Sequence, residues 1–395
     1  HVGHVRKLTG KPVVGVGRFT SPDTMLAQVR RGVLDLIGAA RPSIADPFLP
    51  AKISDGRADE IRECIGCNIC YAGDGQGVPI RCTQNPAMGE EWRRGWHPER
   101  VPPAHAKETV LVVGSGPAGL EASHVLSRRG YTVLLAEAEN EVGGRVVREA
   151  TLPGLSEWIR VRDYRVNLLS SHAGVSLYLA SKMTGDDILA TDADHILVAT
   201  GSRWRRDGRG RTSNLPIPGL QQTTLLTPDD ILDGTLPDGA VTVYDDDNYY
   251  MGSAIAELLA RDGHSVTYVT PTASVASWSS LTTEQPQVHM RLAELGVNIV
   301  LNQTISSFSG GELELACSYT GNTSRISCNS LVPVTSREPV DSLWHELKHK
   351  PNVHRIGDCL APGIIAQAIY DGHKVARELG SDAGSVLVQR ERVCL

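Results

Sequence analysis

The sequence lacks any long apolar segment. No run of apolar residues approaches the roughly 18 that a membrane-spanning helix requires, so we predict no transmembrane helix and no membrane partner. The first ten residues, HVGHVRKLTG, contain neither the apolar stretch nor the small-residue cleavage site of a signal peptide. We therefore expect a cytoplasmic protein.

Positive charge is not in excess either. The chain has 39 Lys and Arg against 45 Asp and Glu, which gives a formal net charge of -6. Nucleic-acid-binding proteins usually present a basic face, so we expect no nucleic-acid partner. Hydrophobic residues make up 41% of the sequence and charged residues 21%, which is typical of a globular protein with two or three domains.

Cysteine is scarce, with 8 residues in a chain of 395. Half of them are scattered, which suits reduced thiols in a cytoplasm better than a disulfide framework. These scattered cysteines are Cys317, Cys328, Cys359 and Cys394. The others follow the spacing C-x2-C-x2-C-x11-C, in the segments ECIGCNIC and RCTQNP, and are Cys64, Cys67, Cys70 and Cys82. Such a concentration indicates a bound group.

The spacing of the grouped cysteines favours a [4Fe-4S] cluster. Structural zinc usually uses two C-x2-C knuckles separated by a longer loop. Three ligands at a three-residue pitch can instead reach different irons of one cubane. Gly66 lets the loop turn close to a bulky inorganic core. A zinc site and four free thiols are the alternatives.

The segment before the cysteines predicts a single β–α–β unit. PVVGVG, residues 12–17, is a short apolar run closed by glycine, as in a buried parallel strand. A helix is expected after Ser21, with Pro22 at its first position, and VLDLIGAA, residues 33–40, is the next strand. Only about fifty residues precede the cysteines, against about 250 in a complete (β/α)8 barrel. We therefore expect the chain to begin inside a barrel whose larger part lies upstream. A small two-stranded appendage is the alternative.

Two arginines follow the ends of these predicted strands. Gly17 and Arg18 come after the first strand, and Ala40 and Arg41 come after the second. Loops after the last two strands of a barrel commonly hold a phosphate through backbone amides and a positive charge. These four residues are therefore candidate phosphate ligands. The alternative places both arginines on surface loops.

A nucleotide-binding fold is predicted after the proline-rich linker HPERVPPAHAKE. The segment TVLVVGSGPAGLEASHVLSRRGYTVLLAE reads as strand, glycine loop, helix and second strand. Gly114, Gly116 and Gly119 supply the tight turn, the close approach of a pyrophosphate and the packing of helix on strand. Glu137 ends the second strand, where its carboxylate can accept hydrogen bonds from ribose hydroxyls.

A second nucleotide fold is expected in AVTVYDDDNYYMGSAIAELLARDGHSVTYVT, but its loop is abnormal. Counting back from the helix end at Gly263 places Gly252 at the third glycine position and Asp247 and Tyr249 at the first two. Side chains there obstruct a pyrophosphate, and three consecutive aspartates, 245–247, repel it. We expect the fold to be kept and the nicotinamide site to be lost. A different strand-to-helix turn with no nucleotide history is the alternative.

Further motifs extend the pattern. With VGGRV, ILVATGS and IGDCLAPG, the two nucleotide folds resemble the two-dinucleotide-fold flavoprotein disulfide reductase superfamily. Along the whole chain, the sequence is similar to the iron–sulfur flavoprotein amine dehydrogenases: trimethylamine, dimethylamine and histamine dehydrogenases and related dimethylglycine demethylases. This similarity rests on ARPSIADPFLP, ECIGCNIC, RCTQNP, GEEWRRGWHPER, VLVVGSGPAGLEA, LPGLSEW, RDYR and VYDDDNYY. The segment YDDDNYY is most like the histamine dehydrogenase branch.

The resemblance implies three cofactors and a set of ligands for each. FMN would be linked covalently to an upstream cysteine, with its phosphate held by Gly17, Arg18, Ala40 and Arg41. A [4Fe-4S] cluster would be held by Cys64, Cys67, Cys70 and Cys82. ADP would be held by Gly114, Gly116, Pro117, Ala118, Gly119, Glu137 and Arg145. The family's catalytic residues belong to earlier barrel strands, so none is assigned in this chain.

The predicted fold class is α/β: the C-terminal part of a (β/α)8 barrel, a cysteine loop and a glutathione-reductase-like pair of dinucleotide folds. The predicted domains are the barrel end (1–60), the cluster loop and linker (61–106), the ADP/FAD-type domain (107–235 and 331–395) and the degenerate NAD-type domain (236–330).

The function that the resemblance implies is oxidative deamination or N-demethylation of a small amine at FMN. Electrons would pass through the cluster to an electron-transfer flavoprotein or a similar acceptor, and the protein would be a homodimer. The alternatives are an NAD(P)H-dependent 2,4-dienoyl-CoA or enoate reductase and a non-catalytic electron-relay subunit.

Overall fold

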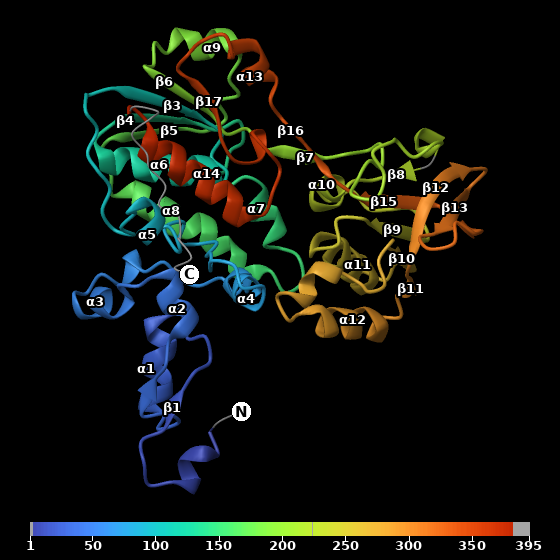
Figure 1. Ribbon diagram of the computed structural model, residues 1–395, viewed down its shortest axis with the longest axis horizontal. Coiled ribbons are helices and arrows are strands. Elements are labelled where there is room, and N and C mark those ends of the chain that lie inside the picture. The colour runs from blue at the N-terminus through green and yellow to red at the C-terminus, as the bar shows by residue number, and fades with distance from the viewer. Residues whose placement is uncertain (1–2, 223, 382–395) are drawn as a thin grey trace, which may run out of the picture. The chain divides into compact units, whose positions relative to one another are not determined.

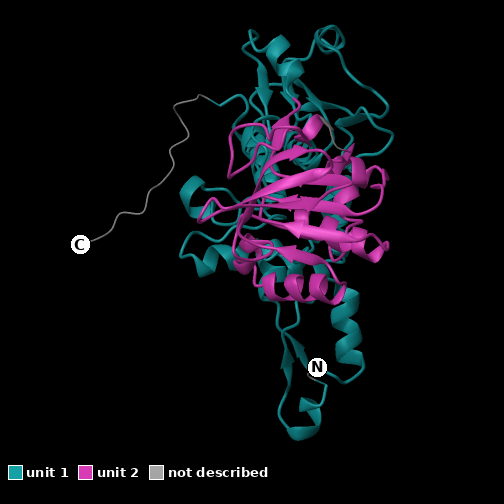
Figure 2. Cartoon of the chain, turned by 90° about the vertical axis from the view of Figure 1, so that its right-hand side faces the viewer, with its two compact units in different colours: residues 1–146, 157–201, 341–395 teal, residues 147–156, 202–340 magenta. Residues whose placement is uncertain are grey.

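The computed structural model describes residues 3–222 and 224–381. The chain forms two compact units (Figure 2). Unit 1 comprises residues 1–146, 157–201 and 341–395, and unit 2 comprises residues 147–156 and 202–340. Among the described residues, no helix is both long and apolar enough to cross a membrane.

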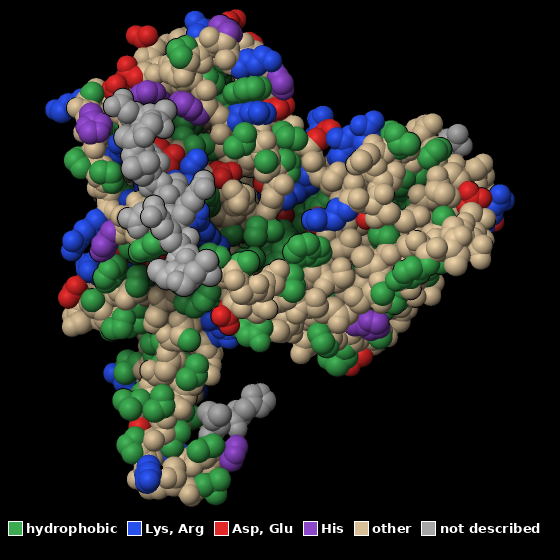
Figure 3. Space-filling model, viewed as in Figure 1, with side chains coloured by type: hydrophobic (Ala, Val, Ile, Leu, Met, Phe, Trp, Pro, Cys, Tyr) green, Lys and Arg blue, Asp and Glu red, His purple; other side chains and the backbone are tan. Residues whose placement is uncertain are grey.

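The N-terminal part of unit 1 contains the expected β–α–β unit. Strands β1 (Val14–Gly15) and β2 (Leu36–Ile37) pair in parallel, and helix α1 (Pro22–Arg30) connects them. Apolar side chains lie exposed along this segment (Figure 3), and Val16 is 70% exposed. The elements that follow or precede this unit are η1 (Val5–Leu8), α2 (Ala40–Ala45), α3 (Leu49–Ser54) and η2 (Ala58–Glu60).

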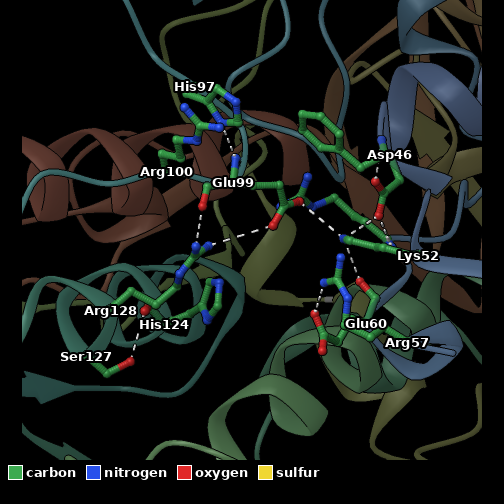
Figure 4. A network of polar contacts seen from close by, with 12 residues as sticks. Asp46, Lys52, Arg57, Glu60, His97, Glu99, Arg100, His124, Ser127 and Arg128 are labelled. Carbon is green, nitrogen blue, oxygen red and sulfur yellow. Dashed lines mark hydrogen bonds and ion pairs between the residues drawn. The ribbon is translucent and has the colours of Figure 1, made fainter. Parts of the chain in front are cut away.

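A buried lysine fixes this N-terminal part to the chain that follows it (Figure 4). Lys52 is 1% exposed, and its ammonium group lies 2.7 Å from Asp46 Oδ2, 2.9 Å from the Glu60 carbonyl oxygen and 3.2 Å from Glu99 Oε1. Asp46 is fully buried and also accepts the backbone N–H of Arg62. All three hydrogens of the ammonium group therefore have acceptors, as a buried lysine requires.

The main sheet of unit 1 is parallel, with strand order β17-β6-β3-β4-β5 (Figure 1). If these five strands are numbered 1 to 5 along the chain and the sheet is read from β5 to β17, the order is 3-2-1-4-5. This is the doubly wound order of dinucleotide-binding folds. The strands are β3 (Thr109–Val113), β4 (Thr132–Ala136), β5 (Val175–Tyr178), β6 (His195–Val198) and β17 (Val353–Arg355).

Both faces of that sheet are covered, because alternate residues of β3 enter different cores. Val110 and Val112 pack in one core with residues of α6 (Pro117–Arg129) and α14 (Ile365–Glu378). Leu111 and Val113 pack in another with residues of α9 (Gly185–Ala190) and α13 (Ser342–Leu347). The remaining elements that lie wholly or partly in unit 1 are α4 (Ile69–Gly75), α5 (Glu91–Arg94), α7 (Arg145–Glu149), η3 (Ser156–Ile159), α8 (Arg160–Ser170) and η6 (Gly357–Cys359).

Unit 2 has its own parallel sheet, in the order β11-β10-β9-β15-β8, and two smaller antiparallel sheets, β12-β13-β14 and β16-β7. The parallel strands are β8 (Thr224–Leu225), β9 (Val241–Asp245), β10 (Val266–Val269), β11 (Asn298–Val300) and β15 (Ser330–Val334). The antiparallel strands are β7 (Ser202–Trp204), β12 (Gln303–Ser309), β13 (Glu312–Cys317), β14 (Thr323–Ser327) and β16 (Arg337–Pro339). The helices are η4 (Leu220–Gln222), α10 (Pro228–Leu232), α11 (Met251–Arg261), η5 (Ser277–Ser280) and α12 (Gln285–Glu294).

The bounds of unit 2 differ from the boundaries 236 and 330 that the sequence suggested. Strand β15 lies between β9 and β8 in one sheet, so the chain beyond 330 and the segment before 236 both belong to this unit. These strands are short and flank connecting segments, and nothing in their own composition assigns them to one sheet rather than the other.

Candidate functional site

The grouped cysteines lie on one loop and the segment that returns to it. Cys64 and Cys67 lie in the loop before α4, and Cys70 lies in the first turn of that helix. Gly66 has φ of +74° and Asn68 has φ of +54°, so the loop reverses direction within each C-x2-C interval. Such left-handed backbone costs glycine little and is tolerated by asparagine, so the sequence CIGCNIC permits this tight path.

Backbone amides are directed at the sulfurs of this loop. The N–H of Gly66 donates to Cys64 Sγ at 3.4 Å. Further backbone hydrogen bonds run from Ile69 to Cys67, from Tyr71 to Cys70, and from Gln84 and Asn85 to Cys82. Hydrogen bonds to sulfur stabilise thiolate ligands and set the potential of iron–sulfur clusters. The donors are therefore arranged as a thiolate-held cluster would require.

All four grouped cysteines are partly buried. Burial raises the pKa of Cys67 and Cys70, and it raises that of Cys82 to about 12. Cys64 also interacts electrostatically with all three, which places the four thiols in one neighbourhood. Without a bound metal such thiols stay protonated and unreactive, whereas metal binding displaces the protons.

Among the described residues, no three His, Cys, Asp or Glu side chains stand close enough together to hold a single metal ion. A tetrahedral zinc ion with Zn–S bonds of about 2.3 Å would bring its sulfurs within about 3.8 Å of one another. A cubane spaces its ligands more widely, because each thiolate binds a different iron.

The two arginines that follow β1 and β2 both contact the cysteine loop. Arg18, which has φ of +53°, places Nη1 where a Cβ atom on Gly66 would lie. Arg41 Nη1 donates to Asn68 Oδ1, and its charge opposes the rise that burial causes in the pKa of Cys70. The predicted phosphate ligands and the predicted cluster ligands therefore lie side by side. Sequence inspection did not reveal this, because no local pattern links residues 18 and 41 to residues 66 and 68.

The other two predicted phosphate ligands flank these arginines. Gly17 is exposed, and a Cβ atom there would meet the Phe19 ring at 3.3 Å. Ala40 begins α2, and its neighbour Arg41 is the second residue of that helix.

The glycine loop of the first nucleotide fold connects β3 to α6 in three residues, 114–116. Gly114 has φ of +104°, and a Cβ atom on it would lie 2.5 Å from the Ala199 carbonyl oxygen. A Cβ atom on Gly119 would overlap the Gly114 carbonyl oxygen, so helix and strand can pack this closely only with glycine there. A Cβ atom on Gly116 would meet nothing within 4 Å, which leaves open space at the start of α6, beside Pro117 and Ala118.

Glu137, just beyond the end of β4, is joined to that loop. Its Oε2 accepts the backbone N–H of Ser115 at 2.8 Å and the Ser115 hydroxyl at 2.6 Å, and its Oε1 accepts the N–H of Glu139 at 3.0 Å. Each carboxylate oxygen can accept two hydrogen bonds, so Oε1 retains capacity for a ribose hydroxyl.

The VGGRV segment lies over the glycine loop. Gly143 donates its N–H to the Ser115 carbonyl oxygen at 3.0 Å, and a Cβ atom on Gly144 would lie 3.1 Å from Gly116 Cα. Arg145 follows as the first residue of α7. The predicted ADP ligands thus converge on one loop of unit 1, and the double glycine is the sequence signal for their close approach.

In the second nucleotide fold, the connection between strand β9 and helix α11 is longer, and carboxylate side chains lie beside it. Five residues, 246–250, separate β9 from α11, against three in the first fold. The Asp245 side chain is fully buried, contacts Gly252 and accepts the Tyr268 hydroxyl. Asp246 accepts the N–H of Thr212 at 2.9 Å. Two carboxylates thus lie at the start of this connection, where negative charge disfavours a pyrophosphate.

The three scattered cysteines within the described residues do not join the cluster loop. Cys328 and Cys359 are buried elsewhere, Cys317 lies in β13, and Cys394 lies outside the described residues. Thr83, whose hydroxyl lies 3.1 Å from Cys67 Sγ, is a contact that the sequence reading did not include. Its position next to Cys82 is the signal that could have identified it.

Three family models match successive parts of the chain. Residues 1–60 match the NADH:flavin oxidoreductase / NADH oxidase family, residues 112–173 match the NAD(P)-binding Rossmann-like domain, and residues 226–350 match the OYE-like second alpha/beta domain. With the fold described above, these matches describe the end of a flavin oxidoreductase domain followed by two nucleotide-type folds, and the predicted fold class is confirmed.

Individual relatives identify the family. Dimethylamine dehydrogenase of Hyphomicrobium sp. (strain x) is 41% identical over 96% of this chain and 56% of its own length. The structure of histamine dehydrogenase from Rhizobium sp. 4-9 is 50% identical, with a TM-score of 0.94 over 99% of this chain and 62% of that one. The structure of 6-hydroxypseudooxynicotine amine oxidase from Pseudomonas geniculata N1 is 51% identical, with a TM-score of 0.94 over 96% of this chain and 58% of that one.

The chain belongs to the iron–sulfur flavoprotein amine dehydrogenase family. It spans between half and two thirds of the length of these three relatives. The resemblance read from the sequence motifs is thereby confirmed.

Proposed function

We propose that this protein is an amine dehydrogenase that oxidises a small amine at FMN, by deamination or N-demethylation, and relays the electrons through a [4Fe-4S] cluster. The observation that supports this most directly is the direction of backbone amides at four grouped cysteine sulfurs, beside two arginines. Its relatives named as dimethylamine and histamine dehydrogenases support the substrate class.

Each group of residues has a role in this proposal. The four grouped cysteines would hold the cluster, which supplies one-electron transfer when bound. Arg18 and Arg41, with the backbone at Gly17 and Ala40, would bind the FMN phosphate through charge-assisted hydrogen bonds. The glycine loop, with Glu137 and Arg145, would bind ADP as a structural ligand. Residues that contact the amine are not assigned in this chain.

We further propose that the electrons leave through a protein carrier of the electron-transfer flavoprotein type, bound through a small transient interface, and that the protein is a homodimer. The connection of 246–250 supports this exit, because its carboxylates disfavour a pyridine nucleotide. The alternative, an NAD(P)H-dependent enoate reductase, requires that nucleotide site.

The test is the metal and nucleotide content of anaerobically purified holoprotein. We expect about four irons per chain, a [4Fe-4S]⁺ EPR signal on reduction, and release of ADP with little FAD on acid extraction. Cys67→Ala should abolish turnover with an external acceptor while substrate still bleaches the flavin, and Cys317→Ala is the matched control. Stoichiometric zinc without iron, or one FAD per chain, would refute the assignments.

A further inference from the structure

Helix α6 carries a buried carboxylate that joins three helices of unit 1. Glu121 is 3% exposed, and its Oε2 accepts Arg165 Nε of α8 at 2.7 Å. Its Oε1 lies 2.7 Å from His373 Nδ1 of α14. Burial alone would raise the pKa of Glu121, but the charge of Arg165 and the hydrogen bond from His373 hold it well below its usual range. Glu121 is therefore a buried anion.

The direction of the hydrogen bonds follows from Arg377, which can only donate. Its Nε lies 2.7 Å from His373 Nε2, so Nε2 is the acceptor and Nδ1 carries the proton that Glu121 receives as a hydrogen bond. Burial lowers the pKa of His373, which keeps the ring neutral. Arg377 also donates to the carbonyl oxygens of His97 and Arg100 at 2.6 and 3.0 Å.

At its other end the network reaches the cysteine segment. The side chain of Arg165 is fully buried, and its guanidinium donates to Gln84 Oε1 at 2.9 Å and to the Gln84 carbonyl oxygen at 3.3 Å. Gln84 Nε2 donates in turn to the Glu63 carbonyl oxygen at 3.1 Å. Glu63 precedes Cys64 and Gln84 follows Cys82 by two residues, so Arg165 and Gln84 together hold both ends of the segment that bears all four grouped cysteines.

The same helix begins at the glycine loop. Glu121 lies two residues after Gly119, within the first two turns of α6. Helix α14 packs directly on this part of α6, since a Cβ atom on Gly372 would overlap the Ala118 carbonyl oxygen. One rigid element therefore bears the pyrophosphate-binding backbone at its start and the centre of the buried network one turn further on.

From these contacts we infer that Arg165 is a positioning residue for the cysteine loop, and that a nucleoside diphosphate bound at the glycine loop stabilises that loop through Glu121, Arg165 and Gln84. This inference rests on the proposed function for the identity of both ligands. A ligand that binds only the folded form stabilises the element it contacts. Opening of the cysteine loop must break the hydrogen bonds of Arg165 to Gln84, and leaving a buried guanidinium without these acceptors is unfavourable. The nucleotide would thus serve retention of the cluster rather than redox chemistry.

The test compares iron release to a ferrous chelator, under anaerobic conditions, from holoprotein with and without excess ADP after nucleotide removal. ADP should slow release severalfold in the unmodified protein. Gln84→Met keeps the Arg165–Glu121 pair and the bond from Arg165 to the carbonyl oxygen of residue 84, but it removes the side-chain bonds to Arg165 and to the Glu63 carbonyl oxygen. Release should therefore be faster and ADP should slow it much less, with unchanged ADP affinity. Gln76→Met is the matched control and should keep the ADP effect, because Gln76 Nε2 donates to the Ala72 carbonyl oxygen of the adjacent helix α4 at 2.9 Å and has no bond to Arg165 or Glu63.

Hydrogen exchange of residues 61–70, with and without ADP, gives the same comparison without iron. Protection by ADP should be present in the unmodified protein, reduced in Arg165→Lys and largely lost in Gln84→Met. Equal protection of Gln84→Met and the unmodified protein would overturn the inference, as would exchange that ADP does not change. A protein that never binds iron would contradict the proposed function instead. Hydrogen exchange would still show whether ADP binding stabilises the cysteine loop.

Discussion

The side chain of Asp245 fills the space beside Gly252 in the second nucleotide fold. A Cβ atom on Gly252 would overlap Asp245 Cγ, and Asp245 Oδ1 accepts the N–H of Asn248 at 2.8 Å. In the first fold, the corresponding glycine, Gly119, makes room for the Gly114 carbonyl oxygen instead. The close helix–strand packing is thus preserved in both folds, but in the second a carboxylate has taken the place of the glycine-loop backbone.

Gly252→Ala tests this relationship. The added methyl group must displace a fully buried side chain, so we expect unit 2 to lose about 1–3 kcal/mol of stability, the usual cost of overpacking. In the background Asp245→Gly, which removes both the Cγ atom and the Cβ atom that would lie 2.6 Å away, the same substitution should cost much less. Chemical denaturation of the four proteins in a double-mutant cycle measures the coupling. Equal costs in both backgrounds would show that the two side chains do not compete for space.

The altered connection of the second nucleotide fold predicts that the protein does not oxidise NADH. Anaerobic titration of the holoprotein with excess NADH should leave the flavin absorbance unchanged, because carboxylates at the start of the 246–250 connection disfavour a pyrophosphate. Dithionite should bleach the same sample and serves as the positive control. Rapid stoichiometric bleaching by NADH would favour the reductase alternative.

The stability of unit 2 should fall as the pH rises from 4 to 7. Burial, with the nearby charge of Asp247, raises the pKa of Asp245 from its ordinary value of 3.8 to about 7. The folded state therefore holds a proton that the unfolded state has lost in this range, and stability decreases with rising pH by about 3 kcal/mol. Asp245→Asn, which cannot titrate, should flatten this slope in denaturation curves that monitor unit 2. If the Asp245→Asn variant keeps the same pH dependence of stability, other titrating groups cause it.

The stability of unit 1 should instead fall as the pH is lowered from 7.5 to 5. Burial lowers the pKa of His373 and lowers that of His124 to about 3, although the charge of Glu121 acts in the other direction. Below pH 6.5 the unfolded state binds protons that the folded state does not, so acid destabilises unit 1, by about 2 kcal/mol at pH 5 from His124 alone. His124→Gln should reduce the acid sensitivity measured by denaturation between pH 7.5 and 5. His289→Gln, which lies in unit 2, is the control and should leave it unchanged.

Much of the fold follows from local sequence signals, whereas the contacts within the sites do not. The strand, glycine loop and helix around Gly114 are encoded in a single continuous segment, and so is the turn of the cysteine loop at Gly66. The contact between Arg18 and Gly66 joins residues 48 positions apart, and Arg165 meets Gln84 across 81. Such contacts depend on how helices and loops pack in three dimensions. Strand β15 illustrates the same limit, because its sheet is decided by its neighbours β8 and β9 and not by its own residues.

Arg41 should set the reduction potential of the proposed cluster. Its guanidinium donates to Asn68 inside the cysteine loop, and its charge acts on Cys70. A positive charge near a cluster stabilises the reduced form, so Arg41→Gln should lower the potential, by on the order of tens of millivolts.

Potentiometry followed by EPR measures this shift directly and does not depend on turnover. Arg41→Lys retains the charge and should shift the potential much less, although it loses the planar donor pair that suits a phosphate. Flavin content, measured in parallel, separates an effect of Arg41 on the cluster potential from a role in binding the FMN phosphate. Loss of FMN without a change in cluster potential would show that Arg41 acts on the phosphate and not on the cluster. Arg57→Gln is the control, because Arg57 is exposed and pairs with Asp55 and Glu60. An equal shift in Arg57→Gln would mean that the effect is general and that the contact with Asn68 does not produce it.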